Sequence, residues 1–325
     1  MSSGVPSGPA VVAFGGGHGL AASLAALRHV TDRLTAVVTV ADDGGSSGRL
    51  RTELGVLPPG DLRMALAALC GDDDWGSTWS RVVQHRFASA GELHGHAVGN
   101  LLIVALWELL GDTVSGLDWM GRLLGAQGRV LPMASVPLDL IADVMGIDPN
   151  APDVVTRVRG QVAVASTSGQ VVGISLHPAS PPACPEAVEA VRTADWLVLG
   201  PGSWFTSVLP HLLVPDLADA LIHSSARRLV TLNLAAQTGE TTGFATETYL
   251  QVLAAHAPGM KLDAVLVDPS TVGDEGGLRR IAASLGAEIV LAPVSMGDGT
   301  ARHDPRLLAA AYHSIFADER GLTWR

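Results

Sequence analysis

The sequence predicts an α/β protein whose core is a Rossmann-like, doubly wound and mainly parallel sheet, with a helical insertion and a small antiparallel hairpin region. Three observations support this prediction. β-branched apolar runs alternate with helical segments, a glycine-rich turn follows the first of those runs, and the chain has 325 residues of which 47% are hydrophobic. Parallel strands joined by helices cross over right-handedly, so a doubly wound sheet is the economical arrangement.

The first βαβ unit is predicted near the start of the chain. Residues 11–14 are apolar and mostly β-branched, residues 15–19 read Gly-Gly-Gly-His-Gly, and leucines then recur at helical spacing over residues 20–27. Residues 35–40 are apolar enough for a second buried strand. Ahead of this unit, residues 1–9 are rich in glycine, proline and serine, and we expect them to form a flexible tail.

We expect one α/β domain over residues 10–325, with two additions to its sheet. Residues of about 61–125 are predicted to form a helical subdomain, because Asp61 follows Pro58-Pro59-Gly60 and can cap a helix there. Residues of about 130–178 carry short β-branched stretches between turns, which predicts an antiparallel hairpin region. Further strands are expected at 161–164, 170–174, 196–199, 228–234, 262–267 and 288–293, and helices at 216–224, 244–256, 278–285 and 305–317.

The composition excludes several classes of function. The chain has 21 basic and 32 acidic residues, a formal charge of −11 and no basic run, so we expect no nucleic-acid partner. The strongest apolar run, residues 101–110, is short and is interrupted by Glu108, so we expect no membrane insertion. Only Cys70 and Cys184 occur, far apart in the chain, which fits a reducing compartment. We therefore expect a cytoplasmic protein.

Glycine-rich and polar turns follow the predicted strands. In open parallel sheets, ligands bind beyond the carboxyl ends of the strands, where such turns meet at one rim. Glycine lets backbone N–H groups approach an anion closely, and each helix that follows points its positive end to the same place. The sequence therefore predicts a phosphate-bearing ligand at this rim, held by turns at residues 15–19, 42–48, 200–203, 237–241 and 297–300.

The first turn has two interpretations. Gly17-x-Gly19-x-x-Ala22 satisfies a dinucleotide fingerprint, and Asp42 lies where an acid that binds ribose would be. A tight strand-to-helix turn, however, needs glycine whatever it binds. A nicotinamide oxidoreductase is accordingly only a third candidate, and we expect no NAD, haem or flavin.

The turn that begins at Asp42 is more specific. Asp42 and Asp43 are followed by two glycines and then by Ser46 and Ser47, a combination that suggests a divalent cation such as Mg²⁺, or a sugar phosphate held by several donors. The alternative is that both aspartates are turn and capping residues. A serine hydrolase is disfavoured because three residues separate the elbow from the strand. A Walker-type site is excluded because no Gly-Lys-Ser/Thr sequence exists.

Histidine and arginine side chains near these turns also have two interpretations. His94 and His96 are two residues apart, but no third ligand of matching spacing appears, so a site-lining or helix-entry role is favoured over zinc. His18 lies inside the first glycine turn, where a bulky imidazole needs a contact. Near the end of the chain, Asp304 can cap the last helix, whereas Arg302 can close on a phosphate.

Six motifs occur in order between about residue 11 and residue 315: Gly15-Gly16-Gly17-x-Gly19-Leu20, Val38 to Arg51 with the sequence VTVADDGGSSGRLR, Pro58-Pro59-Gly60-Asp61, Gly95-His96-x-Val98-Gly99-Asn100, Leu199-Gly200-Pro201-Gly202-Ser203-x-x-Thr206-Ser207, and Gln237-x-Gly239-Glu240-Thr241. Together they resemble the bacterial gluconeogenesis factor family. A related family is the 2-phospho-L-lactate transferase of deazaflavin coenzyme synthesis.

The resemblance implies a nucleotide-type ligand at the rim. The glycines of the first turn, with Gly202 and Ser203, would hold phosphates, and Arg302 would lie over the outer phosphate. The ligand-binding residues implied are Gly15, Gly16, Gly17, His18, Gly19, Asp42, Asp43, Ser46, Ser47, Asn100, Gly202, Ser203, Asn233, Gln237, Thr238, Gly239, Glu240, Thr241 and Arg302, and the candidate metal ligands, which are also the candidate catalytic residues, are Asp42 and Asp43, with Asp61 as a further metal ligand.

Two functions follow from the resemblance. The first is a regulatory protein that binds a nucleotide sugar of the UDP-sugar type and links growth on gluconeogenic carbon sources to cell-envelope synthesis and cell shape. The alternative is a metal-dependent, phospho-lactate-type transferase acting on a nucleotide-diphospho substrate. His18 and Ala21 replace hydroxyl residues of the family's first turn, and Met64 replaces an amide, which favours the regulator. The sequence leaves open whether the chain is an enzyme, whether it forms a homodimer and which regulatory proteins it meets.

Overall fold

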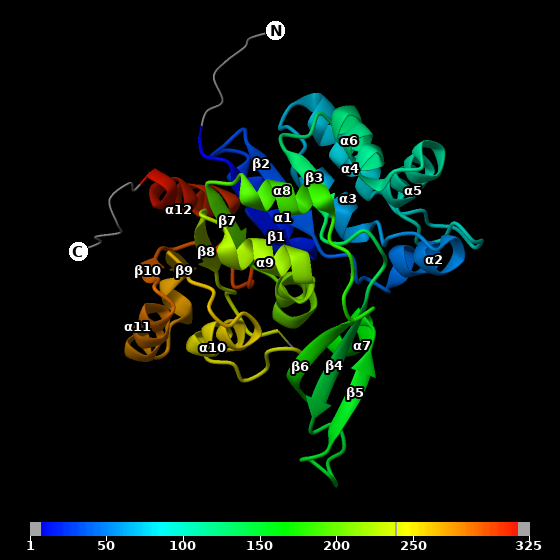
Figure 1. Cartoon of the computed structure of the whole chain (residues 1–325). Helices are drawn as coiled ribbons and strands as arrows, with labels where there is room; N and C mark the ends of the chain where they lie inside the picture. The colour runs from blue at the N-terminus through cyan, green and yellow to red at the C-terminus, as the bar shows by residue number, and fades with distance from the viewer. Residues whose placement is uncertain (1–7, 238, 318–325) are drawn as a thin grey trace.

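The computed structural model describes residues 8–237 and 239–317, and its centre is a seven-stranded parallel sheet (Figure 1). The strands are β1 (Val11–Gly15), β2 (Leu34–Val38), β3 (Arg129–Pro132), β7 (Trp196–Leu199), β8 (Arg227–Thr231), β9 (Ala264–Val267) and β10 (Glu288–Leu291). Their order is β10-β9-β8-β7-β1-β2-β3, with every neighbouring pair parallel. The order reverses between β1 and β7, which confirms the predicted doubly wound sheet.

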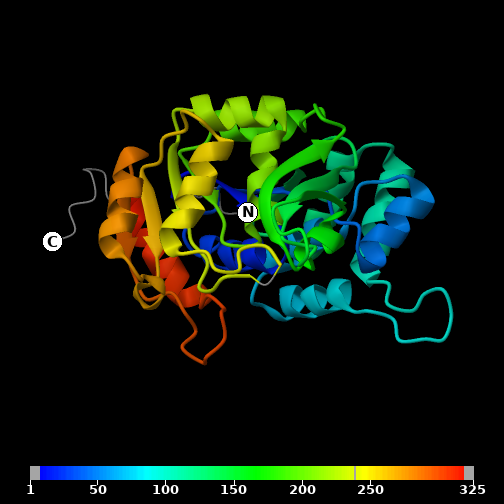
Figure 2. The same cartoon turned by 90° about the horizontal axis from the view of Figure 1, so that it is seen from below.

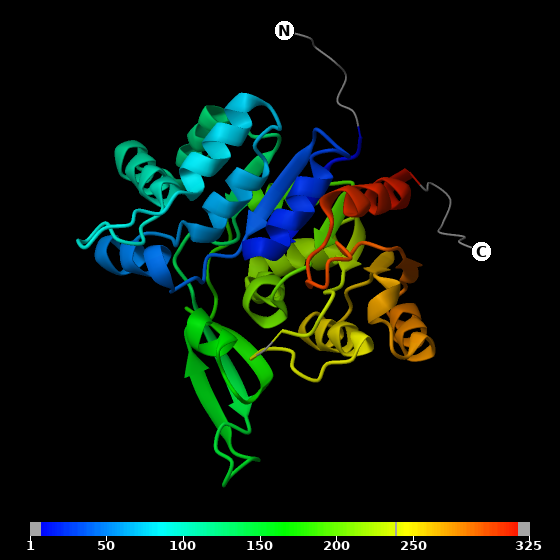
Figure 3. The same ribbon diagram turned by 180° about the vertical axis from the view of Figure 1, so that it is seen from behind.

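The strands are almost continuously apolar because helices cover both faces of the sheet. All five residues of β1 are buried, as are all four of β7 and of β9. In Figure 1, α8 (Pro185–Arg192) and α9 (Pro215–His223) lie across the near face. The opposite face, seen in Figure 3, carries α1 (Gly17–Leu27), α3 (Gly60–Ala68) and α12 (Pro305–Ala317).

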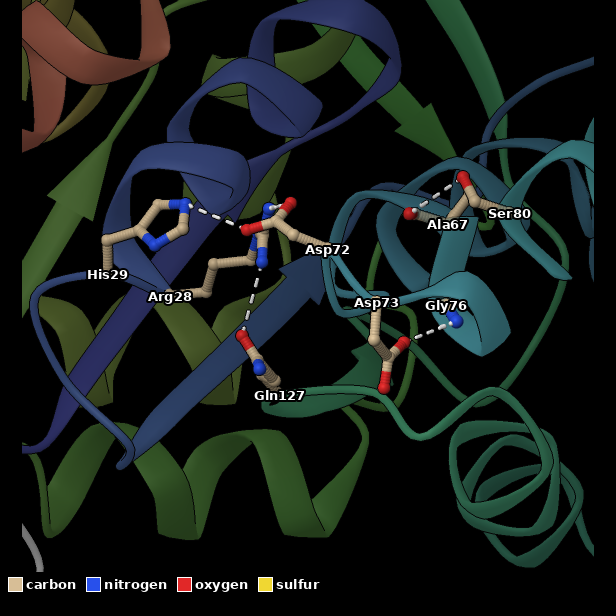
Figure 4. Close-up of polar contacts among 8 residues, drawn as sticks. All are labelled: Arg28, His29, Ala67, Asp72, Asp73, Gly76, Ser80 and Gln127. Atoms are coloured by element: carbon tan, nitrogen blue, oxygen red, sulfur yellow. Dashed lines mark hydrogen bonds and ion pairs between the residues drawn. The ribbon is translucent and has the colours of Figure 1, made fainter. Parts of the chain in front are cut away.

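The helical insertion consists of α3 followed by α4 (Asp74–Gln84), α5 (Val98–Leu110) and α6 (Thr113–Leu124), as predicted for this part of the chain. A polar bridge joins it to the end of α1 (Figure 4). Arg28 donates hydrogen bonds to Asp72 Oδ1 at 2.5 Å and to Gln127 Oε1 at 3.3 Å. Next to it, Asp73 Oδ1 accepts from the Gly76 N–H at 2.7 Å and caps α4.

A small antiparallel sheet lies below the main sheet in Figure 1. It contains β4 (Asp139–Met145), β5 (Val155–Arg159) and β6 (Gln170–His177) in the order β5-β4-β6. Burial alternates along β4, so one face of this sheet packs on the molecule and the other faces solvent. The predicted antiparallel region is therefore present.

One strand prediction in this region was wrong. Residues 161–164 form helix α7 (Gln161–Ala165), in which the Val164 N–H bonds to the Gly160 carbonyl and the Val162 N–H bonds to Asp43 Oδ1. A contact from another part of the chain thus holds a β-branched run in a helical turn. The start of the predicted hairpin region is also different, because β3 is the parallel edge strand of the main sheet.

Two of the predicted turns contain more helix than expected. Helix α2 (Gly45–Leu54) begins inside the predicted turn at 42–48, and α1 begins at Gly17, inside the predicted turn at 15–19. The predicted cap by Asp61 was wrong, because Pro59 occupies the N-cap position and Asp61 lies in the first turn of α3. The remaining elements are the π-helical η1 (Trp204–Val208), the 3-10 helices η2 (Leu209–Leu213) and η3 (Pro269–Thr271), α10 (Thr246–His256) and α11 (Glu275–Ser284).

Two further findings concern the ends and the surface of the chain. Residues 1–7 of the predicted tail lie outside the described residues, whereas the Pro9 carbonyl accepts a hydrogen bond from Thr31 Oγ1 at 2.6 Å. Within the described part of the chain, no single helix has the length and apolarity needed to cross a membrane. The segment from η1 to η2 together with α9, bent by 86°, meets that test by length and composition only.

Candidate functional site

The carboxyl ends of β1 and β7 meet where the strand order reverses. Helix α1 starts directly after β1, and Gly19 in its first turn packs against the backbone that follows β7. A Cβ atom on Gly19 would lie 2.3 Å from the Pro201 carbonyl oxygen and 2.4 Å from Gly202 Cα, so only glycine fits there. Two of the predicted turns therefore lie together at the point where open α/β sheets bind ligands.

The start of α1 faces a carboxylate. Gly16 is the N-cap residue and supplies no side-chain cap, and a Cβ atom on it would lie 2.4 Å from Asp61 Oδ2. That oxygen is buried and has no hydrogen-bond partner. Burial and, after it, the nearby Asp42 carboxylate raise the pKa of Asp61 to about 7, against the opposing effects of the Gly17 N–H and of Arg63.

Asp42 and Asp61, here called the acidic pair, belong to a cluster of oxygen atoms. Asp42 Oδ1 accepts from the Gly44 N–H at 2.9 Å. On the far side of its carboxylate, a Cβ atom on Gly60 would lie 3.0 Å from Asp42 Oδ2 and 2.3 Å from Ser47 Oγ. Thr39, whose Cγ2 atom would lie 2.5 Å from a Cβ atom on Gly16, supplies in Oγ1 a second buried oxygen without a hydrogen-bond partner.

These atoms are hard oxygen donors of the kind that Mg²⁺ prefers. Mg²⁺ in proteins keeps several waters and binds through one or two carboxylates plus the phosphates of a ligand. The acidic pair and its unpartnered oxygen fit that pattern. Among residues 8–237 and 239–317, no cluster of three or more histidine, cysteine, aspartate or glutamate side chains could hold a metal. The arrangement thus suits an ion that is shared with a phosphate-bearing ligand.

Asp43 points away from the acidic pair. Its Oδ1 atom accepts from the Val162 N–H at 3.0 Å, and a Cβ atom on Gly160 would lie 2.2 Å from its Oδ2 atom. Asp43 therefore connects the α2 turn to α7 and the small sheet. Of the three predicted metal ligands, the structure brings Asp42 and Asp61 together, and the assignment of Asp43 stays a prediction.

Side chains that follow β8 shape the turn that follows β7. Asn233 Oδ1 accepts from the Gly202 N–H at 2.9 Å, and Asn233 Nδ2 donates to the Gly202 carbonyl at 2.9 Å. Gln237 Nε2 donates to Ser203 Oγ at 3.2 Å, whereas Gln237 Oε1 is buried without a partner. Asn233 thus fixes the backbone that lies across the rim from the start of α1, and Gln237 orients the Ser203 hydroxyl there.

Glu240 holds the start of η1. Its carboxylate accepts from the Phe205 N–H at 3.0 Å and from Thr206 Oγ1 at 2.7 Å, and burial raises the pKa of Glu240. Gly239 lies close to α7, because a Cβ atom on it would come 2.2 Å from the Ala165 carbonyl. The hydroxyl of Thr241 accepts from the Gln237 N–H at 2.8 Å and from the Tyr249 hydroxyl at 3.0 Å. Thr238 lies outside the described residues.

Ser46 links the α2 turn to the helical insertion. Its hydroxyl oxygen accepts from the Ala97 N–H at 3.3 Å and from Asn100 Nδ2 at 3.0 Å. The Asn100 amide is oriented by Arg63, whose Nε donates to Asn100 Oδ1 at 2.9 Å. With both acceptor positions filled, the Ser46 hydroxyl donates to His96 Nδ1 at 3.0 Å. His96 in its neutral form therefore carries its proton on Nε2.

The other predicted cationic side chains lie farther out. His18 is exposed on the first turn of α1, and Arg302 is exposed in the hairpin of residues 295–303. His94 is exposed and accepts from the Ser89 N–H at 3.3 Å through its Nδ1 atom. Asp304 accepts from the Arg306 N–H at 2.7 Å, so the predicted cap of α12 is confirmed. The phosphate contact of Arg302 stays a prediction.

Sequence reasoning missed two residues of this site. Thr39 is a single hydroxyl residue between buried valines, and a polar residue inside an apolar strand sequence is the signal that could have found it. Arg63 is buried on the apolar stripe of α3, where burial lowers its pKa to about 10. A charged residue on a core-facing stripe is a comparable signal.

Known proteins resemble this chain along most of its length. The family model described as 2-phospho-L-lactate transferase CofD matches residues 11–287. A Mycobacterium tuberculosis H37Rv protein described as "Putative gluconeogenesis factor" is 53% identical over 314 residues, which cover 96% of this chain and 91% of that protein. The "Gluconeogenesis factor" of Bacillus subtilis 168 is 36% identical over 267 residues, covering 82% of this chain and 81% of that protein. The crystal structure of a UPF0052 family member from Bacillus halodurans superposes with a TM-score of 0.83 at 33% identity, covering 94% and 99% of the two chains.

Proposed function

The chain belongs to the CofD family, and on this premise we propose that it binds a nucleotide sugar of the UDP-sugar type at the rim between β1 and β7. In this proposal the bound state regulates cell-envelope synthesis, and with it cell shape, during growth on gluconeogenic carbon sources in the cytoplasm. The names of the relatives support a gluconeogenesis-related function. The observation that carries the ligand proposal is the acidic pair at the start of α1.

The positive end of α1 and the buried Asp61 carboxylate together would suit a diphosphate that carries a cation. The backbone N–H groups of the first turn of α1 and the helix dipole attract an anion. Asp61 Oδ2, buried beside them without a partner, requires a cation or a proton. A Mg²⁺–diphosphate unit would satisfy both demands, because the N–H groups at the start of α1 would hold its oxygens and the acidic pair would hold its metal. Nucleotide sugars carry such a diphosphate between nucleoside and sugar.

The turns around the acidic pair support binding more than turnover. His18 and Ala21 stand where the family usually has hydroxyl donors, and His18 is exposed. Across the rim, Asn233 and Glu240 already hold the turn after β7 and the start of η1 through direct hydrogen bonds. A preformed turn lowers the cost of ordering on binding, which favours affinity. These features suit a sensor whose ligand stays intact.

The second candidate is a phospho-lactate-type transferase acting on a nucleotide-diphospho substrate, and family membership is what favours it. Mg²⁺ bound at the acidic pair would supply charge neutralisation on the phosphate oxygens. The chain itself would orient the diphosphate through the backbone of α1, and Asp61, whose pKa is near 7 in the metal-free chain, would release its proton from Oδ2 when the metal binds. This candidate predicts turnover where the first predicts binding alone.

A thermal-shift screen with Mg²⁺ separates the two functions. We expect UDP-sugars at about 100 times their Kd to stabilise the chain by roughly 2.7 kcal/mol, which raises Tm by several degrees, while the nucleotide is recovered unchanged. Indifference to every UDP-sugar would contradict the proposal. The second arm supplies a deazaflavin acceptor and guanylated phospholactate with Mg²⁺. Product in this arm, dependent on Asp42, would establish the transferase instead.

A further inference from the structure

A groove of about 840 Å³ opens beside the rim, between α2 and the loop of residues 85–97. Figure 2 shows α2 at the edge of the molecule, with this loop projecting next to it. We call the groove the α2 groove and define it by six residues that line it: Asp43, Leu50, Glu53, Leu54, Glu92 and Leu93. Its volume lies within the range of sites that bind ligands or short segments of a partner.

Both walls of the α2 groove present apolar surface to solvent. Leu54 on α2 is 43% exposed, and Leu93 on the projecting loop is 52% exposed. Leu50, one turn before Leu54 on the same face of α2, is buried beneath them. The two leucines face each other across the groove, so an occupant with aliphatic side chains would cover both of them.

The groove is acidic. Asp43, Glu53 and Glu92 contribute three carboxylates, and within the described part of the chain none of them forms an ion pair. Arg49 also lines the groove, but its guanidinium donates to the backbone carbonyls of His94, at 2.7 Å, and of Glu92. The Asp43 carboxylate is partly engaged, because its Oδ1 atom accepts from the Val162 N–H, which leaves Glu53 and Glu92 as the two free carboxylates of the lining among the described residues. Their charge, with the only guanidinium of the lining bonded to backbone carbonyls, disfavours an anion and favours a cationic occupant.

His96 adds a donor of fixed direction. It lines the groove, and its Nδ1 atom accepts from Ser46, so Nε2–H is the ring donor that remains. Burial lowers the pKa of His96 and Arg49 lowers it further, whereas Glu53 and Glu92 oppose this fall. A neutral N–H donor next to carboxylates suits the backbone carbonyl of a peptide, because it binds the carbonyl without repelling basic side chains nearby.

We propose that the α2 groove docks a segment of a partner protein that carries leucine-like side chains flanked by lysine or arginine. The groove shares Asp43 and Gly45 with the turn that holds Asp42. Docking and ligand binding at the rim therefore meet in one turn. That coupling, and only the coupling, rests on the proposed nucleotide-sugar function.

The test uses a fluorescein-labelled twelve-residue peptide with the sequence KLLKKLLKKLLK and the full chain without nucleotide, followed by fluorescence anisotropy. Two double variants probe the groove: Glu53→Gln with Glu92→Gln, and Leu54→Ser with Leu93→Ser. The control double variant is Glu288→Gln with Leu109→Ser, exposed positions outside the groove. All substitutions are at exposed side chains, and thermal unfolding checks that each variant folds.

We expect each groove variant to weaken peptide binding at least five-fold, and the control to change it less than two-fold. Raising the salt concentration should weaken binding to the parent chain and have a smaller effect on the glutamate variant. A peptide with glutamate in place of lysine should not bind. Equal affinity of groove variants and control, or binding of the acidic peptide, would overturn the proposal.

A parallel UDP-sugar titration separates this proposal from the proposed function. Groove-dependent peptide binding in a chain that ignores every UDP-sugar would support the docking surface and remove the nucleotide-sugar assignment. Conversely, UDP-sugar binding with peptide affinity unaffected by the groove variants would remove the docking surface alone.

Discussion

The two sides of the rim use their polar residues in different ways. On the side of β1 and β2, Asp61 Oδ2 and Thr39 Oγ1 are buried and lack hydrogen-bond partners. On the side of β7 and β8, Asn233 and Glu240 make two hydrogen bonds each to the turn and helix that follow β7. Gln237 Oε1 is the exception on this second side, because it is buried without a partner. The first side thus keeps an unpartnered carboxylate oxygen for a ligand, whereas Asn233 and Glu240 on the second maintain the shape of the backbone that the ligand meets.

The turns at the rim thus contain two kinds of polar residue, which differ in whether their buried polar atoms already have hydrogen-bond partners. A residue whose polar atoms are already paired contributes to stability, and its loss exposes unsatisfied donors. A residue with a buried, unpartnered atom lowers stability in the free protein and gains a partner when ligand or metal arrives. Substitutions on the two sides should therefore change stability in opposite directions, which can be checked at Glu240, Asn233 and Asp61.

The largest effect is expected for Glu240→Ala. It removes the acceptor of the Phe205 N–H and of the Thr206 hydroxyl, both buried, so the free energy of unfolding should fall by about 3 kcal/mol. Glu240→Gln keeps an acceptor oxygen and should lose less. Urea unfolding followed by circular dichroism measures both. Full stability of the alanine variant would break the comparison, because Glu240 would then be free for ligand.

A smaller effect is expected for Asn233→Ala. The variant loses the two hydrogen bonds to Gly202, and stability should fall by about 2 kcal/mol. Asn150→Ala, at an exposed position, is the matched control and should change stability by less than about 0.5 kcal/mol. Differential scanning calorimetry of both variants and of the parent measures these changes in stability. Equal effects at both positions would mean that the turn after β7 does not depend on Asn233.

The opposite sign is expected for Asp61→Asn. Because the pKa of Asp61 is raised from 3.8 to about 7 in the folded protein, the folded state binds a proton that the unfolded state has released, and stability falls as pH rises through that window. The asparagine variant lacks this loss and should be more stable than the parent above pH 7, by on the order of 2 kcal/mol. Urea unfolding between pH 4 and 8 shows the crossover, with exposed Asp216→Asn as control. If the free energies of unfolding of parent and variant changed with pH in the same way, the raised pKa of Asp61 would be contradicted.

The smallest effect is expected far from the rim, in the bridge of Figure 4. Asp72 is 70% exposed and pairs with Arg28, so Asp72→Asn should lower stability by less than about 1 kcal/mol. The hydrogen bond from Arg28 lowers the pKa of Asp72, so this contribution is present at neutral pH and disappears as pH falls below the ordinary carboxyl range. Thermal unfolding at pH 7 and pH 3 measures it. A large loss at pH 7 would show that the bridge is more than a surface contact.

The sheet could be predicted from the sequence because its strands are buried on both faces. Trp196–Leu199 and Pro305–Ala317 have the expected bounds, since a four-residue apolar run and a helical stripe with an aspartate cap are strong local signals. Helix α2 was missed because glycine and serine dominate its first turn, where local propensity disfavours a helix. Helix α7 was missed because its turn depends on Asp43, more than 100 residues away.

The site could be predicted only in part, because it too depends on contacts between residues that are distant in the sequence. The position of the rim follows from the order of strands and turns, and Asp42 and Asp61 do lie there. Asp42 and Asp43 are adjacent, so the sequence pattern does not distinguish them. Packing does, because Asp42 accepts from the Gly44 N–H in its own turn and Asp43 accepts from the distant Val162 N–H. The network from Arg63 to His96 likewise joins three segments that no local pattern connects.

The central claim is that the acidic pair binds the ligand through a metal, and isothermal titration of a UDP-sugar with and without Mg²⁺ tests it most directly. We predict Mg²⁺-dependent binding to the parent chain, and at least ten-fold weaker binding to the folded Asp61→Asn variant, with Asp216→Asn unchanged. Equal affinity of parent and Asp61→Asn in Mg²⁺, or affinity that ignores the metal, would contradict the account.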